Sequence, residues 1–566
     1  MNIINRLTLI AVLFVIALTP ELKLQAQNSD NFEIAKNLDI FATMYKELNT
    51  NYVDELKRGE LIKTGIDAML ESLDPYTVYI PESEIEDYKI MTTGQYGGIG
   101  SLIHKQGKYV VISEPWEGSP AQKAGLRAGD KILEVNDKPT LGKSVNDISI
   151  ILKGEPKTSA RLLLERPGES KPIEKEIMRE TITVDNVPYY GMVNDHIGYI
   201  KLTGFTTEAG NESKKAFQAL KEKNNLKGLI FDLRDNGGGL LNEAVNITNI
   251  FVKRGKLVVS TKGKLSDKNR SYYTQAEPLD TIIPLIVLVN GSSASASEIV
   301  CGAIQDLDRG VILGQRTFGK GLVQNVLPLS YNTQMKVTVA KYYIPSGRCI
   351  QAINYSERDT NGIAGKFPDS LKTAFKTLHG RLVYDGTGIE PDLQMEPNTL
   401  SNISYALLSR YLVFDYATQF CLKHDTIDPP GKFEITDEIY RDFLKYISDK
   451  NYDYTTRSEK ELADLRKSTE KEKYFEDVKP EFEALKLKIM HNKNDDLERN
   501  KIEIKRFLSS EIITRYYYQK GRIELQLKKD EDVAKAIEIL DNTKTYLSIL
   551  DSSFDQAQKK VENGKM

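Results

Sequence analysis

A serine-rich turn followed by a glycine-flanked lysine constrains this chain more than any other feature. The apolar run Pro284–Val289 predicts a buried strand, and Val311–Leu313 predicts the next one. Between them, apolar residues at helical spacing predict a helix: Ile299, Val300, Ala303, Ile304 and Leu307. The serines therefore lie at a strand-to-helix turn, where free backbone N–H groups and the helix dipole favour an oxyanion.

The lysine of this segment, Lys320, lies in the turn Thr317–Gly321. A lysine acts as a general base only when neutral, and burial lowers its pKa from the ordinary value of about 10.4. The two glycines that flank Lys320 and the apolar strands nearby could allow the protein to bury this lysine. If the chain is extended there, Lys320 and Gln324 share one face. The residues alone leave an N-cap serine and a surface lysine as the alternative.

The segment resembles the active site of the carboxyl-terminal processing proteases, also called tail-specific proteases. Ser293–Glu298 reads S-A-S-A-S-E and Thr317–Gly321 reads T-F-G-K-G, as in that family. The resemblance implies that Ser295 is the nucleophile and Lys320 its base. It also implies that Gln324, four residues after the lysine, hydrogen-bonds the lysine.

A second motif, Gly228–Gly239, is a strand that ends in a glycine loop and resembles the family's D-L-R-x-N-x-G-G segment. Glycines let a backbone approach a ligand closely. The resemblance implies that Gly238 or Gly239 donates one oxyanion N–H and that Ala296 donates the other. Gly237 stands where proline is more usual. A phosphate-binding loop is disfavoured because no G-x-x-x-x-G-K-[ST] sequence is present.

Upstream, Tyr96–Gly100 and Gly118–Asn136 resemble a PDZ domain of the bacterial protease type. In such domains a peptide adds as a strand, and N–H groups of a glycine loop hold its terminal carboxylate. The predicted binding residues are Gly97, Gly98, Ile99 and Gly100. A simple hairpin turn is the alternative for these glycines. Leu162–Arg166 resembles the closing PDZ strand. An arginine near Arg166 couples the PDZ domain to the active site in some relatives, and here we expect Arg166 to be a solvated strand-end residue.

Composition excludes several other classes of function. A net charge of −3 gives no electrostatic case for nucleic acid. The three cysteines, Cys301, Cys349 and Cys421, are too few for a disulfide framework, and we expect Cys301 to be a core residue. The sequence contains no H-E-x-x-H or C-x-x-C motif, so neither a metal nor another cofactor is expected.

The N-terminus predicts a secretory signal peptide over residues 1–26. Arg6 precedes the apolar run Leu7–Leu18, and Ala26 is a small residue at a plausible cleavage position. The run is short for a spanning helix. An uncleaved anchor is the alternative, and a periplasmic or secreted location follows if the segment is removed.

The whole chain predicts a multidomain α/β protein. We expect a helical segment at 27–88, a β-rich PDZ domain inserted at 89–175, a catalytic core at 176–397 and a charged helical domain at 398–566. The resemblance implies a crotonase/Clp-protease-like core. In the last domain Ile504, Phe507, Leu508 and Ile512 recur at helical spacing. Tyr516–Tyr518 is either a docking patch or a set of helix-packing residues.

These observations predict a serine endopeptidase that captures C-terminal tails of proteins and hydrolyses peptide bonds with a Ser295–Lys320 dyad. An adaptor, or self-association through the helical domain, is a further expected partner. A catalytically silent PDZ scaffold is the alternative function, and the intact Ser295, Lys320 and Gln324 argue against it.

Overall fold

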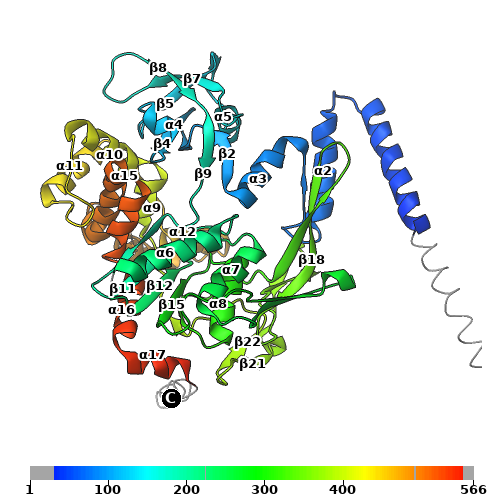
Figure 1. The fold of residues 1–566 in the computed structure, drawn as a ribbon. Coiled ribbons are helices and arrows are strands. Elements are labelled where there is room, and N and C mark those ends of the chain that lie inside the picture. The colour runs from blue at the N-terminus through cyan, green and yellow to red at the C-terminus, as the bar shows by residue number, and fades with distance from the viewer. Residues whose placement is uncertain (1–30, 224, 490–492, 552–566) are drawn as a thin grey trace, which may run out of the picture. The chain divides into compact units, whose positions relative to one another are not determined.

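The structure is a computed structural model that describes residues 31–551 except residue 224 and residues 490–492 (Figure 1). It divides into two compact units, Met1–Tyr79 and Ile80–Met566. The described part of the first unit contains a helix over residues 31–51 and α2 (Arg58–Glu71). The expected signal peptide at 1–26 lies outside the described residues. Within the described ranges, no helix combines the length and apolar content that a membrane span requires.

The second unit begins with η1 (Glu82–Glu84) and α3 (Ile85–Thr93), which lead into the β-rich module. Its entry strand β2 (Gln95–Gly98) pairs antiparallel with its exit strand β9 (Glu180–Thr183). The two ends of the insertion are therefore joined by main-chain hydrogen bonds, and Gly97 and Gly98 belong to this pair rather than to a free turn. The simple hairpin turn considered for these glycines is wrong.

The module itself is an antiparallel sheet of order β3-β4-β5-β7-β8, with β6 on β5. Its elements are β3 (Ser101–Gln106), β4 (Tyr109–Pro115), α4 (Pro120–Lys123), β5 (Lys131–Val135), β6 (Lys138–Pro139), α5 (Val145–Leu152), β7 (Ser159–Glu165) and β8 (Ile173–Met178). The strand expected to close the sheet is β7, but β8 follows it and crosses the expected boundary at residue 175. β3 is an edge strand, and α5 packs beside it.

The solvated position expected for Arg166 is wrong. Its guanidinium makes a bidentate ion pair with Asp130, with Nε–Oδ1 and Nη2–Oδ2 distances of 2.7 Å. Nη2 also donates to the carbonyl oxygen of Gly125 at 2.7 Å. The Asp130 side chain is fully buried, so the charge of Arg166 compensates an acid inside the module. The hydrogen bonds to Asp130 raise the pKa of Arg166.

The core is built on a six-stranded sheet of order β10-β11-β12-β15-β16-β23. Its strands are β10 (Tyr189–Met192), β11 (Ile197–Lys201), β12 (Gly228–Asp232), β15 (Leu285–Val289), β16 (Val311–Gly314) and β23 (Leu393–Gln394). β10 is antiparallel to β11, and all other neighbours are parallel. The strands predicted from Pro284–Val289 and Val311–Leu313 are thus present as β15 and β16.

Alternate residues of these strands point to opposite faces, as a period of two requires. One face packs on α6 (Ala209–Lys223), α7 (Leu241–Phe251) and α8 (Ala296–Asp306). The other face packs on α16 (Glu531–Asp541) and α17 (Thr543–Leu550), near the end of the chain (Figure 1). The last helices of the predicted C-terminal domain therefore form one layer of the core that contains the six-stranded sheet.

A second, antiparallel sheet lies beside this core. It includes β13 (Leu257–Gly263), β14 (Arg270–Tyr273), β17 (Leu322–Pro328) and β18 (Gln334–Tyr343), with β18 between β13 and β17. Short paired strands follow along the chain: β19 (Ile353–Arg358) with β20 (Ala364–Lys366), and β21 (Ala374–Lys376) with β22 (Leu382–Tyr384). β18 carries Tyr342, which reaches the candidate site described below.

The remaining C-terminal residues are helical, as expected: α9 (Asn402–Ser409), α10 (Leu412–Lys423), α11 (Asp437–Ile447), α12 (Arg457–Lys471), α13 (Phe475–Ile489), α14 (Lys493–Arg499) and α15 (Lys501–Leu527). The predicted apolar face of α15 is confirmed, because Ile504, Leu508 and Ile512 are buried in one cluster with α9, α10 and α11.

The three consecutive tyrosines have different partners. The hydroxyls of Tyr516 and Tyr517 donate to the carbonyl oxygens of His424 and Ile427, so these two pack within the helical domain. Tyr518 instead accepts a hydrogen bond from the side-chain amide of Gln122 in the β-rich module. Its φ of 52° interrupts α15. The helix-packing alternative therefore holds for Tyr516 and Tyr517, whereas Tyr518 contacts another part of the same chain.

Candidate active site

The three sequence motifs follow three neighbouring parallel strands. The glycine loop follows β12, the serine turn follows β15 and the lysine turn follows β16. Because parallel strands end at the same edge of a sheet, their loops meet there, which is where α/β enzymes bind ligands. The order of the strands thus brings together segments that lie up to about ninety residues apart in the sequence.

Ser295 occupies the N-cap position of α8, with φ 57° and ψ −113°. A positive φ is uncommon for a residue with a side chain and costs on the order of 1–3 kcal/mol. The backbone N–H of Ser295 donates to Oε2 of Glu298 at 2.8 Å, which helps to hold this conformation. The turn leaves the Ser295 side chain only partly buried, while Ala296 and all following residues of α8 are buried.

The glycine loop lies directly against the serine turn. A Cβ atom built on Gly238 would lie 2.8 Å from both the Cβ of Ser295 and the backbone nitrogen of Ala296. A Cβ on Gly239 would instead lie 2.5 Å from the carbonyl oxygen of Phe205. Each contact is too short for a side chain, so the serine turn requires glycine at position 238 and the Phe205 backbone requires glycine at position 239.

Asn236 joins the glycine loop to the serine turn and is fully buried. Its backbone oxygen accepts from the N–H of Ala294 at 3.0 Å and from the hydroxyl of Ser297 at 2.9 Å. Its side-chain Oδ1 accepts from the N–H of Gly238 at 2.9 Å. The backbone oxygen of Asn236 thus ties the glycine loop to the serine turn, and its buried side chain fixes the shape of the glycine loop, because each of these bonds would be costly to lose.

Glu298 joins the serine turn to the lysine turn. Its Oε2 accepts from the backbone N–H of Ser295 and of Lys320, both at 2.8 Å. Its Oε1 accepts from the hydroxyl of Thr317 at 2.5 Å and from the N–H of Gly319 at 2.7 Å. The side chain is fully buried. Burial raises the pKa of this carboxyl, and the four hydrogen bonds oppose that rise.

Tyr342 of β18 lies on the same two segments. Its hydroxyl is within hydrogen-bonding reach of the carbonyl oxygen of Ser295, at 3.1 Å, and of the carbonyl oxygen of Lys320. Phe318 adds a direct bond, because its N–H donates to the carbonyl oxygen of Ser293 at 3.0 Å. The backbones of Ser295 and Lys320 are therefore held by the same two buried side chains, Glu298 and Tyr342.

Gln324 lies in β17, four residues after Lys320 and beyond the turn. Its side-chain Nε2 donates to Oγ1 of Thr338 at 3.1 Å across the β17–β18 pair. The strand begins only at Leu322, so the extended chain assumed for a common face of Lys320 and Gln324 does not reach back to the lysine. Cys301 is fully buried in α8, as expected, and burial raises the pKa of its thiol.

Sequence reasoning missed the roles of Asn236, Glu298 and Tyr342. A signal for Glu298 was present, because Ser295–Glu298 reads S-x-x-E, the spacing of a capping box at the start of a helix. No local pattern marks Tyr342, which comes from another sheet. In the β-rich module, Gly100 precedes the edge strand β3, and its backbone oxygen accepts from the N–H of Trp116 at 3.0 Å.

Three family models match separate parts of the chain. Residues 196–359 match peptidase family S41, residues 111–166 match the PDZ domain, and residues 403–540 match the C-terminal helical domain of probable PDZ-proteases. The β-rich module is thus a PDZ domain. The first match contains the glycine loop, the serine turn and the lysine turn.

A carboxy-terminal-processing protease of Bartonella bacilliformis is 36% identical over 321 residues, which cover 56% of this chain and 73% of that protein. The chain belongs to the carboxy-terminal-processing protease family. A protein of Staphylococcus aureus named "Probable CtpA-like serine protease" is 34% identical over 320 residues, which cover 56% of this chain and 62% of the relative. The protein is accordingly a serine peptidase of family S41.

Among solved structures, a photosystem II D1 C-terminal processing protease aligns with 30% sequence identity. The alignment covers 64% of this chain and 93% of that chain, with a TM-score of 0.34. The three family models, taken together, give the chain an S41 core, a PDZ domain and a helical C-terminal domain.

Proposed function

We propose that this protein is an endopeptidase that captures the C-terminal tail of a protein in its PDZ domain and hydrolyses peptide bonds with Ser295 and Lys320. The observation that carries the proposal is that Glu298 and Tyr342 each hydrogen-bond to the backbones of both Ser295 and Lys320, which places the two turns side by side. Cleavage of an unfolded protein by the purified chain tests it. The silent scaffold is the outcome if no cleavage occurs.

In the proposed reaction, neutral Lys320 takes the proton from the Ser295 hydroxyl, and the serine oxygen attacks the scissile carbonyl carbon. The lysine ammonium then gives its proton to the leaving amine, and an acyl-enzyme remains. Water attacks the ester with Lys320 again as base, which releases the new C-terminus and restores Ser295. Gln324 orients the lysine.

The oxyanion of both tetrahedral intermediates would be held by the N–H of Ala296 and an N–H of the glycine loop. Ala296 is the first residue of α8, where backbone N–H groups have no partner within the helix. Gly238 contacts the serine turn, but its N–H already donates to Asn236. Use of that N–H would compete with this bond, so Gly239 stays an equal candidate.

The PDZ domain offers a place for a peptide strand. β3 is an edge strand, and α5 lies beside it. The four predicted binding residues lead into β3: Gly97 and Gly98 end β2, and Ile99 and Gly100 form the short loop that follows. A peptide that pairs with β3 would place its terminal carboxylate at this loop, and α5 would line the pocket for its last side chain.

Amidation of a peptide's C-terminus should weaken its binding by about tenfold or more, or at least ~1.4 kcal/mol, because the loop loses a charged partner. Calorimetry on the full chain with Ser295→Ala measures this without cleavage. The matched peptides share an apolar C-terminal residue and differ only in acid or amide. Equal affinities would contradict tail recognition by this loop, while cleavage could persist.

The proposal extends to fold and location. Parallel strands with helices on both faces support a core of the crotonase/Clp-protease type. Arg6 and the apolar run Leu7–Leu18 support a cleaved signal peptide and a periplasmic or secreted protein. We expect mass spectrometry of the protein from its native host to give an N-terminus near residue 27. A mature chain that retains residues 1–26 would support the uncleaved anchor instead.

A further inference from the structure

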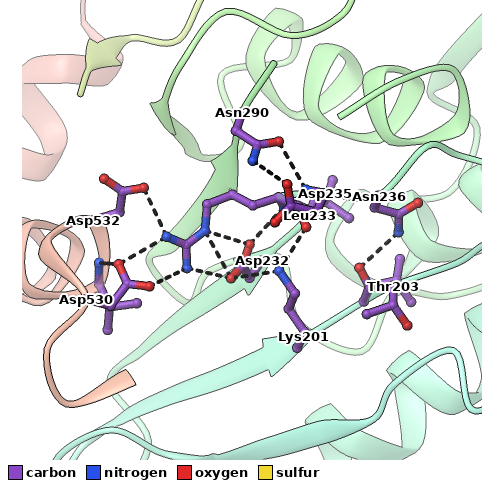
Figure 2. A network of polar contacts seen from close by, with 12 residues as sticks. Lys201, Thr203, Asp232, Leu233, Asp235, Asn236, Asn290, Asp530 and Asp532 are labelled. Atoms are coloured by element: carbon purple, nitrogen blue, oxygen red, sulfur yellow. Dashed lines mark hydrogen bonds and ion pairs between the residues drawn. The ribbon is translucent and has the colours of Figure 1, made fainter. Parts of the chain in front are cut away.

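Arg234 connects the glycine loop to the C-terminal helical domain. Its guanidinium donates from Nη1 to Asp530 and Asp532 at 3.0 Å, and from Nη2 to Asp530 at 2.8 Å. Nε and Nη2 also donate to Asp232, at 3.0 and 2.7 Å. Figure 2 shows Asp530 and Asp532 on one side of this network and Asp232 and Lys201 on the other.

The network is mostly buried, so its charges are screened less than those of exposed ion pairs. The side chain of Arg234 is 15% exposed, and those of Asp530 and Asp532 are 20% and 18% exposed. Burial lowers the pKa of Arg234, but the carboxylates of Asp232 and Asp530 outweigh burial and raise it. Lys201 contacts Asp232 at 3.3 Å, so two cations face three carboxylates.

The backbone around Arg234 continues into the candidate active site. Lys201 Nζ donates to the carbonyl oxygen of Arg234 at 2.8 Å. Asp235 exchanges two hydrogen bonds with the side chain of Asn290, at 3.0 and 2.8 Å. Asn236 follows, with its bonds to Ala294 and Gly238. The segment is thus held between the serine turn and the carboxylates of Asp530, the N-cap of α16, and Asp532 in its first turn.

We propose that Asp530 and Asp532 are positioning residues for catalysis: by holding the Arg234 guanidinium, the C-terminal helical domain sets the glycine loop against Ser295. The inference rests on the proposed function, in which that loop binds the oxyanion. Neither aspartate touches the reacting atoms. Asp530 and Asp532 act on the glycine loop through Arg234, which lies four residues before Gly238. The C-terminal domain would thereby influence the rate of catalysis.

A purely structural role is the competing explanation, because Val533, Ala536 and Ile539 of α16 pack on the sheet. The two explanations differ in what they change. Loss of packing lowers the melting temperature, whereas loss of positioning lowers kcat in a chain that is still folded. A shift of about 1 Å in a catalytic group can reduce a rate up to about a hundredfold.

The test uses the full chain with Asp532→Asn, which removes charge and keeps size. Asp532→Glu is the rescue variant, because it keeps the charge. Glu538→Gln is the matched control, since Glu538 lies on the same helix and its carboxylate pairs with Lys535 on the exposed side at 2.8 Å. Asp530→Asn is a second variant that preserves the N-cap bond to Val533, because asparagine caps helices as well as aspartate.

Kinetics are measured with a short peptide substrate, at a temperature where circular dichroism finds every variant folded. We expect Asp532→Asn and Asp530→Asn to lower kcat about tenfold or more with KM within about twofold. Asp532→Glu should recover much of the loss, and Glu538→Gln should match the unmodified chain. Unchanged kcat in the two asparagine variants, or a lower melting temperature alone, overturns the inference.

Hydrogen exchange separates this inference from the proposed function. If the loop is held by α16, the amides of residues 234–239 exchange faster in Asp532→Asn than in Glu538→Gln, whether or not the chain cleaves anything. If exchange there is equal in the two variants, the inference fails. If the unmodified chain does not cleave peptides, the proposed function fails, and the exchange result still decides whether α16 holds the loop.

Discussion

Ser295→Ala and Lys320→Ala will each abolish cleavage of an unfolded protein substrate while the chain stays folded. The expected loss is more than about 10³-fold, because a nucleophile and its base act as one unit and removal of either removes the covalent route. Initial rates measured with a fluorescently labelled unfolded protein give the comparison. Circular dichroism and melting temperature show that the fold persists.

Ser292→Ala is the matched control, because Ser292 lies in the same turn but is exposed at the surface. It should keep a rate close to that of the unmodified chain. A lysine base also requires the rate of the unmodified chain to rise from neutral to alkaline pH, since only the neutral amine accepts the serine proton. Near-normal cleavage by either alanine variant, or a pH–rate profile that is flat, would show that the dyad is assigned incorrectly.

The second large effect is expected from Glu298→Gln. Each carboxylate oxygen of Glu298 accepts two hydrogen bonds. Glutamine replaces one of these oxygens by an NH₂ group, which cannot accept, so two buried donors lose their acceptor. Each unpaired buried donor costs about 1–3 kcal/mol, so the free energy of unfolding should fall by about 2 kcal/mol or more. The cleavage rate should fall by about a hundredfold, because the Ser295 and Lys320 backbones lose a shared anchor.

Chemical denaturation and kinetics on the same preparations measure the two effects. Glu390→Gln is the control, because that carboxylate forms a half-exposed ion pair with Arg316. Its loss should change stability by no more than about 1 kcal/mol. If Glu298→Gln and Glu390→Gln behave alike in both measurements, Glu298 does not hold the two turns together.

Local patterns predicted the parts of the site that are local. The apolar runs before the glycine loop and the serine turn are β12 and β15, and the helix predicted after Ser295 is α8. These predictions hold because burial on both faces of a parallel strand leaves a continuous apolar run in the sequence. The prediction that the glycine loop approaches another backbone closely also holds, because Gly238 and Gly239 leave no room for a Cβ atom.

The rest depends on contacts between distant segments. The sequence predicts a solvated Arg166 because its partner Asp130 lies 36 residues earlier and nothing in the sequence pairs the two residues. Glu298 holds the two turns together only because its carboxylate also contacts the turn at Thr317–Gly321. Tyr342 reaches the site only because β18 lies beside it. The sequence does not identify the surface that α16 covers, because an apolar helix face does not specify its partner. That surface is the catalytic sheet.

The position of α16 and α17 along the chain has a consequence for how the enzyme matures. A growing polypeptide that ends before residue 530 already contains Ser295, Lys320 and the glycine loop. It leaves one apolar face of the sheet in water, however, and Arg234 without two of its carboxylates. Pairing segments so far apart is slow, because a long loop must close first. We therefore expect α16 and α17 to dock late in folding, and we expect a chain truncated before residue 530 to lose both stability and peptidase activity.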